Sequence, residues 1–394
     1  MGGGLMQLVA YGAQDIYLTG NPQITFFKVV YRRHTNFSME SIEQTWDGSS
    51  TTNGRCTATI SRNGDLVHRM YIDVRGQFGD TDSSNPGNEW IKYVELEIGG
   101  QKIDKHSGVW METWAELSES NPSGIVQSVA QNDASGNGTT FQNMSGTGGV
   151  VGANVDSLHC FVPLQFWFCR NPGLALPLIA LQYHEVKVIL EHTIVTTFDE
   201  AVTHNKLWVD YIYLDTDERR RFAQVSHEYL IEQVQEQTLA NASGSHDLNF
   251  NHPVKELIWT CADAADGVAT RTSLLPVSDA LTDTFQLKLN GHDRFAAREY
   301  LYFSRVQVWQ HHTGHGGLDS RNTVLGGGAN DSICVYSFAL KPEEHQPSGT
   351  CNFSRIDNAQ LVSSGQVPPN SLIFAVNYNV LRIMSGMGGL AYSN

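Results

Sequence analysis

Three histidines at the start of a glycine-rich segment have the spacing that comes nearest to a metal site. His311, His312 and His315 lie in the stretch "HHTGHGG", and imidazole nitrogens are common ligands of divalent metal ions. The segment supplies no rigid element that would fix the three rings in one geometry. The sequence therefore favours a solvated turn here, and it predicts neither a metal site nor a cofactor.

A second group with chemical potential is the triplet Glu343, Glu344 and His345 in "KPEEHQPSG". A carboxylate and an imidazole within hydrogen-bond reach can act as general acid and base. Adjacent residues in a turn bounded by prolines do not converge on one substrate atom, so we expect a turn stabilised by hydrogen bonds. The sequence also lacks the motifs GxxxxGKS/T, GxSxG and HExxH, and it predicts a protein that is not an enzyme and has no catalytic residue.

Asn-x-Ser/Thr sequons are the candidate modification sites. Six asparagines have this pattern: Asn36, Asn137, Asn143, Asn241, Asn330 and Asn352. Asn137, Asn143 and Asn330 fall in segments rich in Gly, Ser, Asn and Thr, which usually lie on protein surfaces. These three are therefore the candidate glycosylation sites, and a glycoprotein is expected where the chain meets a glycosylating system.

The elements that must position these residues are mostly β-strands. Several stretches alternate apolar and polar residues or are rich in β-branched and aromatic side chains, as strands are: "YIDVRG", "WIKYVELEIGG", "YHEVKVIL", "LWVDYIYLDT", "FQLKLNG", "YLYFSRVQVWQ", "ICVYSFAL" and "SLIFAVNYNVLRIMSG". The dipeptide Asn63-Gly64 suits a tight hairpin turn. "GVWMETWAELS" is a candidate helix, and "FAQVSHEYLIEQVQEQ" is either a short helix or a strand.

Two low-complexity segments, residues 118–157 and 311–331, occupy corresponding places in the two halves of the chain. Such segments are expected on the surface, outside any packed core. Each follows a strand with a glycine turn ("ELEIGGQKI" or "QLKLNGHDRF"), and each precedes an apolar strand, a Pro-Gly turn and a final strand. Matching landmarks in the same order predict two tandem copies of one domain, with both segments at the same end.

Short strands, turns rich in Gly and Pro, and few helices are typical of β-sandwiches. We therefore predict an all-β chain of two tandem eight-stranded antiparallel jelly rolls with long surface loops and few short helices. The expected organisation is an N-terminal arm at residues 1–25, a first jelly roll at 26–216 and a second at 217–394. At the junction, the arginines of "DTDERRRF" follow acidic residues, which favours a salt-bridged connection over a nucleic-acid patch.

Composition narrows the functional classes. The 394-residue chain has 41 Asp and Glu against 26 Lys and Arg, a formal net charge of −15, so no specific nucleic-acid partner is expected. Charged residues make up only 17%, below the usual ~25%, which suggests surface that is glycosylated or buried against other copies. Six cysteines without a CxxC pair are expected as free buried thiols. No apolar run approaches the ~20 residues of a membrane span.

Several long stretches carry a specific resemblance to a known family: "LVAYGAQDIYLTGNPQITFFKVVYRRHTNFSMESIEQTW", "ISRNGDL", "YSFALKPEEHQPSGTCNFSRIDNAQL" and "NYNVLRIMSGMGGLAYSN". The chain resembles the major capsid proteins of nucleocytoplasmic large DNA viruses, in particular those of the chlorella-virus (phycodnavirus) type. The match runs from Leu8 to the C-terminus, and it weakens in the two low-complexity segments and around residues 195–280.

The resemblance implies a double jelly roll that forms a homotrimer. The trimer would be a pseudo-hexagonal capsomer that tiles an icosahedral virion shell over an internal membrane, after assembly in the host cell cytoplasm. Neighbouring capsomers and minor capsid proteins are the implied partners. The N-terminal arm would lie at the base of the capsomer, where Lys28, Arg32 and Arg33 are candidate contacts to acidic neighbours, minor capsid proteins or anionic lipid. Pairing of Arg32 and Arg33 with carboxylates of their own subunit is the alternative.

Two other functional classes stay open on the residues alone. A carbohydrate-binding jelly roll would bind soluble glycans without ordered self-assembly. A β-sandwich hydrolase would need converging carboxylates, which the sequence does not reveal. A stable trimer in solution is expected only for the capsid interpretation.

Overall fold

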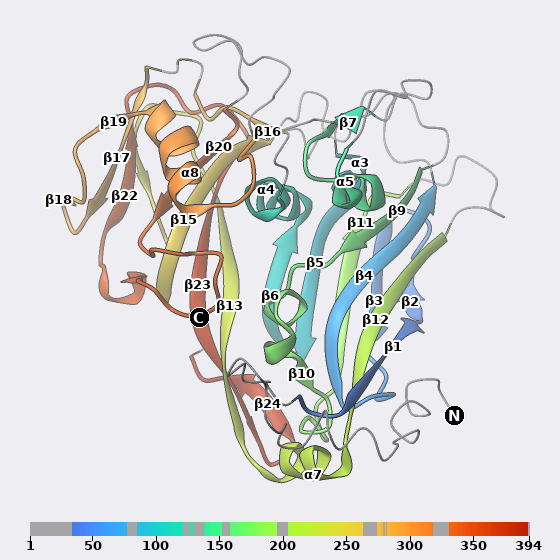
Figure 1. The fold of residues 1–394 in the computed structure, drawn as a ribbon. Helices are drawn as coiled ribbons and strands as arrows, with labels where there is room; N and C mark the ends of the chain where they lie inside the picture. The colour runs from blue at the N-terminus through green and yellow to red at the C-terminus, as the bar shows by residue number, and fades with distance from the viewer. Residues whose placement is uncertain are drawn as a thin grey trace, which may run out of the picture.

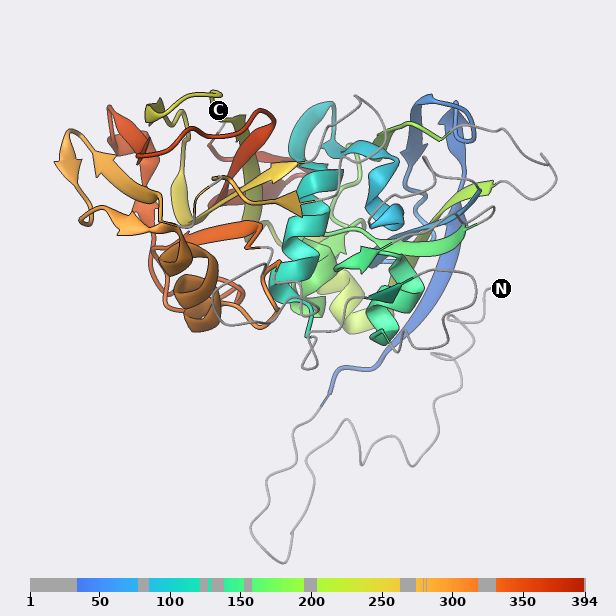
Figure 2. The ribbon, with the colours of Figure 1, turned by 90° about the horizontal axis from the view of Figure 1, so that it is seen from above.

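The structure is a computed structural model of the chain, and it describes residues 34–76, 85–120, 127–128, 138–151, 158–194, 204–262, 274–278, 280, 282–317 and 331–392. Two antiparallel β-sandwiches lie side by side, one from each half of the chain, as the views from the front and from above show (Figure 1, Figure 2). The predicted all-β class and double jelly roll are confirmed.

The strands up to residue 214 form the first sandwich, apart from a separate two-stranded parallel sheet of residues 127–128 and 150–151. They are β1 (Phe37–Gln44), β2 (Trp46–Gly48), β3 (Gly54–Thr59), β4 (Leu66–Gly76), β5 (Ile91–Ile98), β6 (Gln101–Ser107), β7 (Gln127–Ser128), β8 (Val150–Val151), β9 (Leu158–Pro163), β10 (Leu176–Pro177), β11 (Val186–His192) and β12 (His204–Leu214). The helices that accompany them are α3 (Pro86–Glu89), α4 (Gly108–Ser118), α5 (Thr140–Ser145), α6 (Trp167–Arg170) and the 3-10 turn Pro172–Leu174.

The second sandwich follows helix α7 (Thr216–Gln224). Its strands are β13 (His227–Thr238), β14 (Gly244–Asp247), β15 (Pro253–Ala262), β16 (Leu274–Leu275), β17 (Thr284–Leu289), β18 (His292–Asp293), β19 (Arg298–Glu299), β20 (Ile333–Ser337), β21 (Cys351–Asn352), β22 (Ala359–Ser363), β23 (Ser371–Met384) and β24 (Met387–Leu390). Between them lie a π-helical turn (Tyr302–Val306), α8 (Gln307–His311) and the 3-10 turn Phe353–Arg355.

Strand order repeats between the two sandwiches. In the first, one sheet runs β1-β12-β4 with β9 and β10 on β4, and the other runs β2-β3-β11-β5-β6. In the second, β13-β23-β15-β20 and β14-β22-β17-β18 follow the same order. The first strand of each sandwich therefore pairs with its last long strand, β1 with β12 and β13 with β23. This closure is the jelly-roll topology, and its repetition confirms the predicted internal duplication.

The hydrophobic core continues from one sandwich into the other. The largest cluster of buried apolar side chains contains residues of both halves, and Trp110 of α4 meets Phe374 of β23 with ring centroids 5.2 Å apart. A second cluster, around Trp259 and Phe285, lies within the second sandwich. The two jelly rolls therefore pack through a buried apolar contact.

Helix α4 covers the stretch predicted as a helix, Gly108–Ser118. The Ser107 side chain accepts a hydrogen bond from the backbone N–H of Trp110 at its start, a standard N-terminal cap. The ambiguous stretch is helical up to Gln224 and then forms β13. The predicted salt-bridged junction is confirmed, because Arg219 Nε lies 2.9 Å from Asp65 Oδ1.

The hairpin predicted at Asn63-Gly64 is wrong. β3 and β4 belong to opposite sheets, so the chain crosses the sandwich there. A Cβ on Gly64 would lie 2.7 Å from Tyr211 Cβ, which shows that the glycine permits a close approach. Tight hairpins occur instead at Gly99-Gly100 between β5 and β6, at Asn290-Gly291 between β17 and β18, and at Ser385-Gly386 between β23 and β24. Both residues of each pair have positive φ, as these turns require.

The strand predicted over "YLYFSRVQVWQ" is also wrong, because those residues form the π-helical turn and α8. Their aromatic residues suit a strand by propensity, but Phe303 is buried against Trp259 and Phe285 in the second core. Tertiary packing has overridden local propensity. This helical stretch follows the β17 hairpin, as α4 follows the β5–β6 hairpin in the first sandwich.

The expectation that the low-complexity segments stay out of the packed structure is wrong for several of their described residues. Ser145, Thr147 and Val150 are buried, and so is His312. The backbone explains this result, since the N–H groups of Gly148 and Gly149 donate to the buried carboxylate of Glu112. The described parts of both segments lie at one end of the molecule, near α5 and α8, while α7 lies at the opposite end (Figure 1).

Candidate functional site

Most of the residues predicted for modification or base contacts lie outside the described residues. This holds for Lys28, Arg32 and Arg33 and for two of the candidate glycosylation sites, Asn137 and Asn330.

Asn143 is the candidate glycosylation site that the structure describes. It lies in α5 with an exposed side chain, and its Nδ2 donates to the carbonyl oxygens of Gly138 and Thr139 at 3.2 and 3.0 Å. Ser145 of the same sequon is buried, and its hydroxyl donates to the Phe141 carbonyl. The asparagine therefore faces solvent from a folded helical turn, while the serine does not.

The three histidines of the second low-complexity segment do not converge. His312 is buried, with Nε2 3.0 Å from Glu256 Oε2 and Nδ1 3.1 Å from Glu343 Oε1. His311 Nδ1 lies 3.3 Å from the Leu340 carbonyl oxygen, and His315 lies beside Gly149 of the first sandwich. His312 is thus held as an ion-pairing residue between two carboxylates.

The triplet Glu343, Glu344 and His345 also separates into individual contacts. Glu343 accepts from the backbone and hydroxyl of Thr313 in addition to His312. Glu344 pairs with Lys341 at 2.8 Å on the surface, and His345 Nδ1 lies 3.5 Å from Glu232 Oε1. The side chains point to different partners, which agrees with the predicted hydrogen-bonded turn.

A buried charge network at the seam between the sandwiches was not predicted from the sequence. Glu232 of β13 lies 2.9 Å from Lys255 Nζ of β15 and 3.1 Å from Arg170 Nη1 of α6, which belongs to the first sandwich. Burial alone would raise the pKa of Glu232, but Lys255, His345 and Arg170 outweigh burial and lower this pKa to about 2. The Arg170 guanidinium also lies 4.2 Å above the Trp114 ring of α4. The network therefore ties the two halves together.

A second buried group on α4 holds two glutamates one helical turn apart. Both Glu112 and Glu116 are buried, and burial raises the pKa of Glu112 to about 7 despite its hydrogen bonds from Asn88, Gly148 and Gly149. Burial and the neighbouring Glu112 raise the pKa of Glu116 well above its ordinary value. At neutral pH the pair of carboxyl groups, Glu112 and Glu116 together, therefore retains a proton. This arrangement stabilises a loop, because the N–H groups of Gly148 and Gly149 donate to Glu112.

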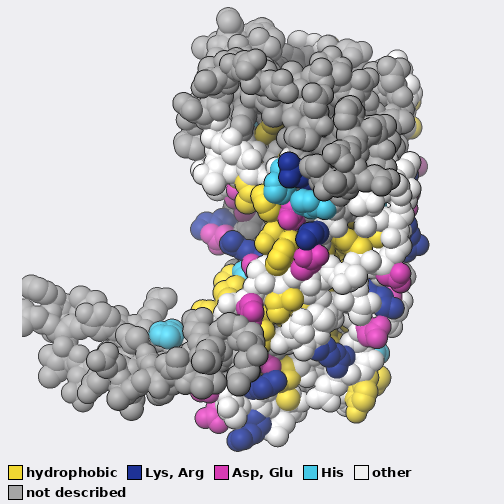
Figure 3. Space-filling view, turned by 90° about the vertical axis from the view of Figure 1, so that its right-hand side faces the viewer, with side chains coloured by type: hydrophobic (Ala, Val, Ile, Leu, Met, Phe, Trp, Pro, Cys, Tyr) yellow, Lys and Arg dark blue, Asp and Glu magenta, His cyan; other side chains and the backbone are white. Residues whose placement is uncertain are grey.

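Among the described residues, apolar side chains are exposed on surfaces of both halves of the chain, and two of these surfaces are large. The ridge formed by Val306, Trp309 and Leu340 includes Trp309 of α8 itself, and Trp309 and Leu340 are 81% and 75% exposed. The outer face of the sheet β1-β12-β4-β9 carries Tyr71, Phe161 and Trp208, all half-buried. Figure 3 views the molecule from the side of this sheet, and apolar side chains gather in the middle of the view. Large exposed apolar patches mark contact surfaces.

Two tandem jelly rolls joined through a buried seam, with apolar outer surfaces, define the class of double jelly-roll coat proteins. Comparisons agree. The family model for the N-terminus of major capsid proteins matches residues 25–215, and the model for large eukaryotic DNA virus major capsid proteins matches residues 218–389. The chain therefore belongs to the family of major capsid proteins of large eukaryotic DNA viruses, and its role is that of a structural protein of the virion capsid.

Individual relatives support this assignment over full length. The chain is 54% identical to the major capsid protein of Pyramimonas orientalis virus and 41% identical to that of Paramecium bursaria Chlorella virus 1, in each case over 100% of both chains. Among solved structures, the quasi-atomic model of the PBCV-1 virus capsid matches with a TM-score of 0.73 and 37% identity, over 94% of this chain and 100% of that chain.

The described residues contain no helix that is both long enough and apolar enough to cross a membrane. All six cysteines are free, as the sequence predicted, and five are buried, but Cys351 is partly exposed instead of buried.

Proposed function

We propose that the chain acts as a homotrimer, the capsomer of the shell, and that it performs no catalysis. The observation that carries the trimer is the pair of unlike apolar surfaces on different halves of the chain: the ridge of Val306, Trp309 and Leu340 on the second half, and the outer face with Tyr71, Phe161 and Trp208 on the first.

Two different surfaces favour a head-to-tail contact over a two-fold one. In a two-fold dimer each patch meets its own copy, whereas unlike patches that fit each other generate a closed ring when the rotation between copies closes. Three chains with two similar sandwiches each would give six similar walls, which suits hexagonal packing in a shell. A permanent contact of this kind typically buries more than ~2,000 Å² and is apolar at its centre.

The remaining assignments complete the proposal. Residues 1–25 act as an arm, with residues 26–216 and 217–394 as the two jelly-roll domains. Lys28, Arg32 and Arg33 contact minor capsid proteins or the internal membrane at the base, and assembly takes place in the host cytoplasm. The low charge content supports extensive burial against neighbouring capsomers. Asn137, Asn143 and Asn330 carry glycans on the outer end, which the exposure of Asn143 supports.

Light scattering coupled to size exclusion tests the trimer. The expected mass is three times the 43.6 kDa of the chain. Trp309→Asp combined with Leu340→Asp should yield a folded chain of lower mass, because a charge in the apolar centre of an interface is costly. Val225→Asp changes a 54%-exposed side chain just after α7, at the opposite end, and is the matched control. A wild-type monomer at micromolar concentration would refute the proposal, and so would a double variant that stays trimeric.

A further inference from the structure

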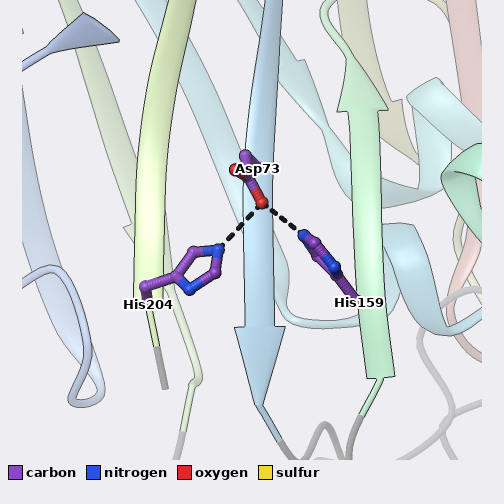
Figure 4. A group of neighbouring side chains, drawn as sticks. All are labelled: Asp73, His159 and His204. Carbon is purple, nitrogen blue, oxygen red and sulfur yellow. Dashed lines mark hydrogen bonds and ion pairs between the residues drawn. The ribbon is translucent and has the colours of Figure 1, made fainter. Parts of the chain in front are cut away.

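Two histidines and one aspartate meet on the outer face of the first sandwich. Asp73 Oδ1 of β4 lies 2.8 Å from His159 Nε2 of β9 and 2.9 Å from His204 Nε2 of β12 (Figure 4). The strands β9 and β12 flank β4 on either side, and Arg75 is the register partner of both histidines. Asp73 lies two residues before Arg75 on the same face, so the three side chains converge diagonally on one point.

The surrounding sheet holds these three groups in place and leaves them accessible. The side chains of Asp73, His204 and His159 are 13%, 30% and 43% exposed. The His159 ring packs on Phe161 with centroids 4.7 Å apart, and it stands nearly perpendicular to the His204 ring. Ligands on three neighbouring strands of one sheet need little reorganisation on binding, unlike the histidines of a glycine-rich turn.

We propose that Asp73, His159 and His204 form a binding site for one divalent transition-metal ion, with zinc as the best-suited ion. Two imidazole nitrogens and one carboxylate oxygen are a donor set that zinc uses at sites with a fourth position open to water or a further ligand. The three donor atoms lie within 4.8 Å of one another.

For each nitrogen–oxygen pair, zinc geometry requires only a small increase in distance. Ligands placed ~2.0–2.1 Å from a tetrahedral zinc ion lie ~3.3 Å apart, slightly more than the observed N–O distances. Zinc binding uses the Nε2 lone pair of each imidazole, so the ring proton of the bound form resides on Nδ1. The carboxylate of Asp73 forms no ion pair with Lys or Arg of the described chain, since Lys206 pairs with Glu43.

Arg75 supplies a discriminating test. Its exposed side chain lies between the two histidines in register, and its positive charge repels a bound cation. Arg75→Gln should therefore tighten zinc binding, while it would have no such effect if the cluster were only a set of hydrogen bonds.

The experiment is a zinc titration of the purified full-length chain by calorimetry, together with visible absorption of the cobalt(II) form. We expect one zinc ion per chain at this site and cobalt bands typical of low coordination number. His159→Gln and His204→Gln should each weaken binding at least about tenfold. His292→Gln changes an exposed histidine of β18 outside the cluster and should leave binding unchanged.

Zinc affinities of the wild type and of the variants decide whether the site exists. Asp73→Asn keeps the size of the side chain but weakens its donor oxygen. It replaces a histidine variant in the titration if that variant fails to fold. Wild-type protein that binds no zinc at ~100 μM, or that binds it as tightly after His159→Gln and Asp73→Asn as before, overturns the site. The three ligands belong to one chain, but His159 packs on Phe161 of the proposed trimer contact, so the titration is repeated on the Trp309→Asp/Leu340→Asp variant to separate the site from trimer formation.

Discussion

At the scale of single residues, His312 shows how partners can reverse the effect of burial. Burial alone would lower the pKa of a histidine, because it disfavours the charged ring. Here Glu256 and Glu343 face the two ring nitrogens and raise the pKa of His312 to about 9. The ring is therefore doubly protonated at neutral pH and donates to both carboxylates, while Trp114 of the first sandwich packs edge-on against it.

His312→Gln should destabilise the protein in a pH-dependent way. A histidine whose folded pKa exceeds its unfolded value of ~6.5 stabilises fully below pH ~6.5, and this contribution is lost as pH rises through about 9. The loss of free energy of unfolding should reach about 3 kcal/mol at pH 6 and largely vanish at pH 10. Thermal unfolding of wild type and variant at both pH values, at fixed protein concentration, measures it. His292→Gln is the exposed control, and an equal deficit at both pH values would contradict the ion-pair account.

For Glu112 we predict a pH-dependent change in stability that arises from burial and not from an ion pair. Its folded pKa of about 7 lies above the usual 4.5, so the folded state holds a proton that the unfolded state releases. Stability from this group therefore falls as pH rises from ~4.5 to about 7. Glu112→Gln keeps an acceptor for Gly148 and Gly149 but cannot ionise, so it should flatten that decline. Thermal midpoints at pH 5 and pH 7.5 test this, with Glu97→Gln on β5 as control. A variant with the same decline as wild type would show that Glu112 does not titrate in this range.

At the scale of elements, the glycine-rich segment after α5 behaves as part of the fold. Replacing residues 138–150 by a Gly/Ser linker removes the capped turn of α5 and the two N–H donors to Glu112. A buried carboxyl group that loses its donors costs several kcal/mol, so the variant should unfold at clearly lower temperature. Replacing residues 129–137 instead keeps β7 in place and should leave the thermal midpoint unchanged. Calorimetry measures the thermal midpoint of both variants. If the variant of residues 138–150 unfolded at the wild-type temperature, the segment would not contribute to the stability of the fold.

Element types followed from the sequence wherever local signals and packing agreed. The apolar stretch of α4 and the alternation in β5, β11 and β12 identified those elements correctly. The two errors had physical causes. Asn63-Gly64 has hairpin composition, but the chain crosses between sheets there and the glycine fits against Tyr211. Residues 302–311 have strand composition, but their aromatic side chains fill the second core from a helical backbone.

The side-chain clusters could not have been found from the sequence. Asp73, His159 and His204 come from strands that are distant in sequence, and only the register of β9 and β12 on β4 brings them together. The same holds for Glu232, whose partners Arg170, Lys255 and His345 lie on both sandwiches. A jelly roll pairs strands that are far apart in sequence, so local spacing carries no trace of such contacts.

At the scale of the whole molecule, the two sandwiches act as one packed body. The shared apolar cluster is accompanied by polar contacts across the seam. Val234 of β13 donates its N–H to Asp104 of β6 at 3.1 Å, and Leu390 of β24 donates to Gln101 at 3.1 Å. We therefore expect a single cooperative unfolding transition for the two halves instead of two separate ones.

Substitution of Glu232 tests whether the two sandwiches unfold in one cooperative transition. Its carboxylate neutralises Lys255, whose side chain is fully buried, and it reaches Arg170 on the other sandwich. Glu232→Gln leaves a buried ammonium without its counter-charge, which typically costs 3–5 kcal/mol, whereas Glu232→Gln combined with Lys255→Met removes both charges and should recover most of the loss. The folded pKa of about 2 lies below the usual 4.5, so the wild-type contribution is present above pH ~4.5 and is lost as pH falls through about 2. Calorimetry at pH 7 and pH 3 should show one transition that shifts as a whole, with a smaller deficit for Glu232→Gln at pH 3. A variant in which only part of the unfolding heat moves would show instead that the two jelly rolls unfold independently and that the seam does not couple them.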